Sequence, residues 1–242
     1  MRAAADRTMA VGTARAAVSI AADLAGTGTV DWRAATATFN FARTGAQAHL
    51  GDKFDIVVAG DREWLRAEGA SGGLPGTSAA QPWIDGSPRA VVARAHSRVD
   101  PLGTLLVRPG IGTGLAFLRG ATKVTSYGGE EVQGVSTFRY TFEVDLTQAI
   151  ANSPPADRSA LQAAADAIGP VLWPADVWLD SSGRVRRLQM AENPFAHTTT
   201  TRASLLFTQD GNYLALTNIQ FSDFGVPATI AGPPADQVVQ VS

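Results

Sequence analysis

Apolar and polar residues alternate with a period of two along much of this chain, which is typical of strands with one buried face. The pattern is clearest over residues 134–146, where Phe138, Tyr140 and Phe142 point one way and the residues between them are polar or charged. A similar alternation runs through residues 13–24. The sequence therefore predicts long, half-buried antiparallel strands.

Turn sequences divide the strand-like segments into hairpins. The predicted strands cover residues 13–24, 29–41, 53–59, 63–67, 121–127, 134–146, 174–180, 184–191, 200–209 and 213–222. We expect Ala25-Gly26-Thr27-Gly28 to join the first two and Gly60-Asp61 to join the next two. Glu130-Glu131, which follow two glycines, are assigned to the tip of a later hairpin.

Helical patterns occupy four shorter segments, predicted at residues 2–10, 101–108, 112–119 and 154–168. The second and third are rich in leucine and are separated by Pro109-Gly110. Ser153 is the expected N-cap of the fourth helix. Residues 226–242 are expected to form an extended tail.

Hairpins at both ends of the chain, with helices between them, favour an α+β fold over an alternating βαβ arrangement. Long antiparallel strands twist and coil. We therefore predict a large curved antiparallel sheet, a half-barrel, with helices packed on its concave face. Nothing resembles a linker, so residues 1–242 are predicted to form one domain.

Composition suggests that some apolar surface is turned inward, because 45% of residues are hydrophobic and only 17% are charged. Several positions predicted to point inward are small, namely Ala16, Ala22, Ala34 and Thr36. Small inner residues leave space, and an empty cavity costs about 24 cal/mol per Å³. A buried lipid chain would return about 0.8 kcal/mol per methylene. A filled core explains the same residues, so both interpretations stay open here.

Charge and cysteine content exclude several classes of function. The net charge is −2, which gives no basic excess to neutralise nucleic-acid phosphates. There is no cysteine, and hence no disulfide, thiolate metal site or cysteine nucleophile. No uninterrupted apolar run is long enough to predict a membrane-spanning helix. The residues after Met1 show no signal peptide, so we expect either a cytoplasmic protein or a chain that starts after a removed export signal.

No motif for catalysis or metal binding emerges from the sequence. His49, His96 and His197 each lack a second ligand at metal-binding spacing. The segment 105–114 resembles a dinucleotide-binding loop, but Leu115 stands where the third glycine is required. We therefore expect a protein that is not an enzyme and that has no cofactor and no metal.

Four segments carry a resemblance to a known family. They are residues 120–140 with Gly129-Glu130-Glu131-Val132-Gln133-Gly134-Val135, residues 174–188 with Trp178 and Asp180-Ser181-Ser182-Gly183, residues 221–227 with Pro233-Pro234, and the pair Trp64 and Trp83. Together they resemble the LppX/LprA/LprF/LprG family of actinobacterial lipoproteins, which is related in fold to the lipoprotein carrier LolA. These motifs are strands and turns, so they specify the fold better than the ligand.

The resemblance implies a non-enzymatic envelope lipoprotein that binds, and transports, a lipid, an acylated glycolipid or a lipoprotein between sheet and helices. Family members are exported and anchored through an N-terminal lipidated cysteine, so this chain would begin after that residue. A membrane transporter is an implied partner, and a monomer is expected. The candidate cavity-lining residues are Val18, Ile20, Leu105, Leu106, Ile111, Leu115 and Leu118.

Two alternatives remain. An envelope interaction or sensor module would have a filled core and an exposed apolar patch that docks a partner protein. A hydrolase with a site built from dispersed residues would require a buried Ser–His or carboxylate pair. Each of the candidate lining residues is equally explained as plain core.

Overall fold

The computed structural model describes residues 1–20, 24–44, 53–60, 62–68, 77–85, 111–168, 173–191 and 216–240. The strands are β1 (Thr13–Ile20), β2 (Leu24–Asp31), β3 (Thr36–Arg43), β4 (Lys53–Ala59), β5 (Arg62–Glu68), β6 (Trp83–Asp85), β7 (Ala121–Val132), β8 (Val135–Val144), β9 (Trp173–Asp180), β10 (Val185–Ala191), β11 (Leu216–Ser222) and β12 (Val238–Gln240). The helices are α1 (Arg2–Ala10), α4 (Ile111–Ala116), η2 (Phe117–Gly120), α5 (Leu146–Ala151), α6 (Pro155–Ile168) and η4 (Ala235–Gln237).

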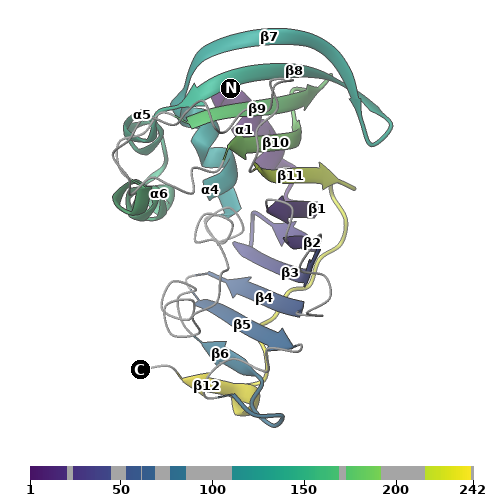
Figure 1. Ribbon diagram of the computed structural model, residues 1–242, viewed down its shortest axis with the longest axis vertical. Helices are drawn as coiled ribbons and strands as arrows, with labels where there is room; N and C mark the ends of the chain where they lie inside the picture. The colour runs from purple at the N-terminus through teal and green to yellow at the C-terminus, as the bar shows by residue number, and fades with distance from the viewer. Residues whose placement is uncertain are drawn as a thin grey trace.

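All twelve described strands belong to one sheet, in the order β12-β6-β5-β4-β3-β2-β1-β11-β10-β9-β8-β7. Neighbours are antiparallel, with the single exception of β12, which pairs parallel with β6 among the described strands. Figure 1 shows that the sheet is curved and unclosed, with β7 and β8 arching over one end. The predicted α+β fold, a large curved antiparallel sheet carrying helices, is confirmed.

One face of the sheet forms the main core, and we call it the inner face. Its buried side chains alternate along each strand, for example Ala16 and Val18 on β1 and Phe39 and Phe41 on β3. The helices α1, α4, α5 and α6 gather beside the β7–β11 end of the sheet (Figure 1). Leu115 and Leu118 from α4 and η2 belong to the same core, so these helices lie on the inner face. None of the described helices is long and apolar enough to cross a membrane.

The first hairpin differs from the prediction. Residues 25–28 lie inside β2 instead of forming a turn, and the predicted strand 29–41 is interrupted at residues 32–35. Asp31 causes this break, because its Oδ1 accepts hydrogen bonds from the backbone N–H groups of Arg33 (2.9 Å) and Ala34 (3.0 Å). Ala34 is exposed in that turn and does not point inward as predicted, and Ala37 takes the inward position in place of Thr36.

The β7–β8 hairpin also differs from the prediction. Glu130-Glu131 lie within β7, and the turn occurs at Gln133-Gly134, where both residues have positive φ (50° and 75°). That conformation matches the twist of two antiparallel strands, and it suits glycine at the second position. β8 ends at Val144, because Asp145 accepts a hydrogen bond from the Gln148 N–H (3.1 Å) and caps α5, a helix absent from the prediction.

The C-terminal segment lies on the opposite face of the sheet, which we call the outer face. The Gly225 N–H donates to the Thr13 carbonyl (2.8 Å), and the chain then passes to the far end of the sheet and adds β12 beside β6. A second apolar cluster forms there from Val57, Trp64 and Val238. Figure 1 shows this segment running past the ends of β1–β5.

Candidate functional site

Phenylalanines line the inner face of the half of the sheet formed by β2–β6. Phe39, Phe41 and Phe54 are each at most 8% exposed, and the rings of Phe39 and Phe41 stack with their centroids 5.8 Å apart. The alternation in β3 places Thr38 and Asn40 on the outer face. The apolar surface continues over the strands β4–β6 through Ile56, Val58, Leu65 and Ile84.

Two glycines in β2 allow these rings to lie flat against the sheet. A Cβ atom on Gly26 would be 2.5 Å from Cδ1 of Phe41, and one on Gly28 would be 2.5 Å from Cδ1 of Phe39. Real Cβ atoms do not approach so closely, so only glycine fits under the rings. The inner face of this half is therefore an aromatic surface laid over bare backbone.

The other half of the inner face is covered by the described helices. Leu115, Phe117, Leu118 and Leu161 are at most 1% exposed there. Figure 1 places no described helix over β2–β6. The two halves of the inner face therefore differ in whether a described helix packs on them.

Arg119 fastens these helices to one another. Its side chain is 6% exposed and forms ion pairs with Asp6 of α1 (2.7 Å) and Asp157 of α6 (2.8 Å). The Asn152 side chain donates to the Arg119 carbonyl (3.1 Å), which adds the end of α5. Arg119 thus joins α1 and α6 through its guanidinium group and the end of α5 through its backbone carbonyl.

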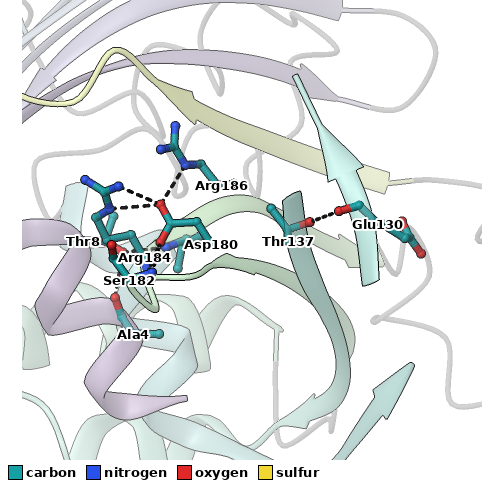
Figure 2. Close-up of polar contacts among 9 residues, drawn as sticks. Ala4, Thr8, Glu130, Thr137, Asp180, Ser182, Arg184 and Arg186 are labelled. Atoms are coloured by element: carbon teal, nitrogen blue, oxygen red, sulfur yellow. Dashed lines mark hydrogen bonds and ion pairs between the residues drawn. The ribbon is translucent and has the colours of Figure 1, made fainter. Parts of the chain in front are cut away.

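Asp180 forms a similar centre at the β9–β10 turn (Figure 2). It accepts hydrogen bonds from the Ser182 and Arg184 N–H groups (2.9 and 3.1 Å) and from the Arg184 and Arg186 side chains (3.0 Å each). Burial alone would raise the pKa of this carboxyl group, but the hydrogen bonds from Arg184 and Arg186 outweigh it and lower the pKa of Asp180 below its ordinary value.

Thr8 ties α1 to the same turn, as Figure 2 also shows. Its hydroxyl donates to the Ala4 carbonyl (2.7 Å) and accepts from the Val185 N–H (2.8 Å). Thr8 is fully buried, so both hydrogen bonds are shielded from water.

Trp178 is the centre of a polar cluster on the outer face. Arg139 and Arg187 lie over its ring, at 5.2 and 4.6 Å from the centroid, and its indole N–H donates to Glu130 (2.7 Å). Arg139 also pairs with the buried Asp176 (2.8 Å). Each charge here has a partner of opposite sign or an aromatic face, which indicates a structural role.

The structure places the predicted lining residues at several locations. Val18 (3% exposed), Leu115 and Leu118 are core residues of the inner face. Ile20 ends β1 and Ile111 begins α4, but their side chains lie outside the described part, as do Leu105 and Leu106 entirely. Their role in lining a cavity stays a prediction.

The prediction omitted Phe39, Phe41 and Phe54. Their signal was present in the alternation Thr36-Ala37-Thr38-Phe39-Asn40-Phe41. The predicted turn at residues 25–28 puts Gly26 and Gly28 in a loop, so the sequence pattern does not place them opposite the phenylalanine rings. Pairing Gly26 with Phe41 and Gly28 with Phe39 requires the correct register.

The described residues contain no group of three or more histidines, cysteines or acidic residues arranged to hold a metal ion. His49, His96 and His197 lie outside the described part. The described geometry consists of an apolar inner face and of buried ion pairs that hold the surrounding elements together.

Comparison with known proteins supports the architecture. No protein-family model and no curated protein sequence matches the chain. Among solved structures, the lipoprotein LppX of Mycobacterium tuberculosis matches with a TM-score of 0.50 and 14% identity, over 95% of this chain and 97% of LppX. LprF of Mycobacterium bovis matches with a TM-score of 0.51 and 12% identity, over 95% of this chain and 93% of LprF. The curved sheet and its helices therefore have the LppX and LprF fold that the sequence motifs indicated.

Proposed function

We propose that this protein binds a lipid or an acylated glycolipid without chemical turnover. The acyl chains would lie on the aromatic half of the inner face, over Phe39, Phe41 and Phe54. One observation carries the proposal: this half carries a continuous row of apolar inner-face side chains with no described helix over it, whereas the described helices pack directly on the other half. Burying one long acyl chain would return on the order of 10 kcal/mol before the costs of binding.

The fold supports this proposal, since LppX is a lipoprotein and its fold is shared over nearly the whole chain. By the same resemblance, we propose an exported protein, anchored in the membrane by a lipidated N-terminus and facing the periplasm-like or extracellular side. Transport of the lipid, delivery to or from a membrane transporter, and a monomeric state belong to the same proposal.

Native mass spectrometry of protein purified without detergent tests the proposal directly. We expect a population whose excess mass disappears after organic extraction, and extracted protein should take up a pyrene-labelled fatty acid. Protein that is free of lipid from the start and takes up none would contradict the proposal.

Two matched variants locate the site. Phe41 lies on the aromatic half and Phe142 (1% exposed) under the helices, and both are buried on the inner face. Phe142→Ala should lower stability by about 3–5 kcal/mol, the usual cost of such a cavity, with fatty-acid uptake per folded molecule unchanged. Phe41→Ala should change uptake severalfold at a smaller stability cost. Equal stability losses with unchanged uptake would show that the aromatic half is filled core.

A second candidate is docking of a partner protein. Val124, Tyr127 and Phe138, on the β7–β8 hairpin, are 47%, 66% and 55% exposed. Exposed apolar side chains at one end of a sheet suit a protein interface. A Tyr127→Ser/Phe138→Ser double variant that loses a cross-linked envelope partner while keeping its lipid would favour this function.

A further inference from the structure

The outer face carries a hollow of about 590 Å³. It is formed by β11, β1, β2, β3 and β4, and its floor contains Ala17, Ala25 and Ala42. The register places Ala17 beside Thr27 and Ala25 beside Ala42 on neighbouring strands. Gly26 also borders the hollow. Adjacent small side chains on one face of the sheet therefore create this hollow.

Each of the three amide side chains at its rim uses one of its two polar groups, either the carbonyl oxygen or the NH2 group, in a hydrogen bond within the protein. Arg187 Nε donates to Asn218 Oδ1 and Gln133 Nε2 donates to Gln220 Oε1, both at 2.9 Å. These contacts use the carbonyl oxygens and leave the NH2 groups of Asn218 and Gln220 to donate. Across the hollow, Asn40 donates its NH2 to Asp55, which leaves its carbonyl oxygen to accept.

One positive charge stands at the same rim. Lys53 is exposed and borders the hollow, and no ion pair of its ammonium group is found among the described residues. The nearby carboxylate of Asp55 is already held by Arg66 and Asn40. Glu68 lies opposite Lys53 in the register of β4 and β5, and its carboxylate pairs with Arg66 (3.6 Å). Both neighbouring carboxylates therefore have other partners, and the ammonium of Lys53 is open to an anionic ligand.

We propose that this hollow binds a saccharide that carries one acidic group. Sugar hydroxyls both donate and accept, so they match a rim with amide donors, an amide acceptor and the hydroxyls of Ser19 and Thr27. Alanine methyl groups match the C–H face of a sugar ring, and the ammonium of Lys53 matches a carboxylate or phosphate. The volume lies within the range of small-molecule sites, about 300–1,000 Å³. The polar rim of the hollow lies on the outer face, opposite the proposed lipid surface, and the inner-face residues Val18 and Phe41 also border the hollow.

A titration with galacturonic acid, followed by NMR of isotope-labelled protein, tests this site. Galactose and acetate serve as the neutral and the charge-only probes. We expect galacturonic acid to shift the amide signals of Ala17, Ala25 and Ala42, galactose to do so more weakly, and acetate to have little effect. Lys53→Gln should weaken the affinity for galacturonic acid about tenfold, which is the effect of losing one charge-assisted hydrogen bond. The affinity for galactose should stay unchanged.

Two tryptophan variants provide the controls. Ala42→Trp fills the hollow and should abolish binding of both sugars, whereas Thr125→Trp, on an exposed position of β7, should leave binding intact. The proposal is overturned if galacturonic acid causes no shifts, or if Ala42→Trp still binds it. Acetate that binds as tightly as galacturonic acid would also overturn the proposal, since the site would then recognise an anion alone.

Discussion

Asp180 and Arg119 show how single side chains hold this fold together. Each is almost completely buried and is satisfied by several charged or backbone partners. Asp180 closes the β9–β10 turn, and Arg119 connects α1, η2 and α6. Removing a partner of such a buried charge is costly to stability, because the remaining charge is left without compensation.

The lowered pKa of Asp180 predicts a pH-dependent contribution to stability. A carboxyl group whose pKa is lower in the folded state stabilises it above the unfolded value, about 3.9. This stability is lost as the pH falls through the folded-state pKa. Asp180→Asn should lower the free energy of unfolding by about 2 kcal/mol at neutral pH. In urea titrations, the difference in the free energy of unfolding between Asp180→Asn and the wild type should shrink below about pH 4. A gap that is constant across this range would show that Asp180 contributes through shape and not through its charge.

Arg119 should contribute far more to the free energy of unfolding than an exposed arginine does. Arg119→Met removes both ion pairs of a buried guanidinium and is expected to cost about 3 kcal/mol, measured by urea unfolding. Arg15→Met is the matched control, because Arg15 and Asp223 are 3.7 Å apart and both more than half exposed. The control should cost less than about 1 kcal/mol. Similar losses of stability in the two variants would contradict the role of Arg119 in holding the helices together.

At the scale of elements, β2 and β3 depend on each other through glycine and phenylalanine. Gly26 and Gly28 alternate with Ala25 and Thr27, so the inner face of β2 carries no side chain under the two rings. β2 forms despite the weak strand propensity of glycine, because Phe39 and Phe41 cover it. Packing between strands therefore overrides the local turn preference of residues 25–28.

Gly26→Ala tests this pairing. The added Cβ would meet the backbone oxygen of Asn40 and the Phe41 ring at 2.5 Å, and the backbone cannot move aside cheaply. We expect a loss of about 1–3 kcal/mol, as for other overpacked positions, measured by thermal unfolding. Gly129→Ala is the control, since its Cβ would lie 3.8 Å from the nearest atom. Gly26→Ala with unchanged stability would mean that β2 is free to move away from the rings.

At the scale of the whole molecule, the sheet is one continuous layer whose two faces differ. The inner face is helix-covered over β7–β11 and aromatic over β2–β6. The outer face carries the Trp178 cluster, the hollow and the C-terminal segment over Trp64. On the proposed function, the lipid would lie on the half that carries no described helix.

A bound lipid should raise the stability of the whole chain. A ligand that binds only the folded state at a hundred times its dissociation constant adds about 2.7 kcal/mol. Organic extraction should therefore lower the melting temperature, and adding back the pyrene-labelled fatty acid should restore it. Identical melting curves before and after extraction would oppose a lipid in the folded state.

The sequence by itself determined the elements whose signals are local. The hairpin of β4 and β5 follows from alternation around Gly60-Asp61, and that of β9 and β10 from Asp180-Ser181-Ser182-Gly183. In both, the turn residues are adjacent in the chain, so no distant contact is needed to place them. The family resemblance rested on such motifs, which is why it indicated the architecture correctly.

Only the tertiary structure decided the features that depend on contacts between distant segments. Whether residues 25–28 turn or extend was settled by the Phe39 and Phe41 rings of the next strand. The ion pair between Arg119 and Asp6 joins residues 113 positions apart, and the outer hollow needs residues from five strands. Periodicity along the chain predicts which face of a sheet a residue takes, but not which distant residue lies opposite it. Both proposed ligand sites depend on those distant neighbours.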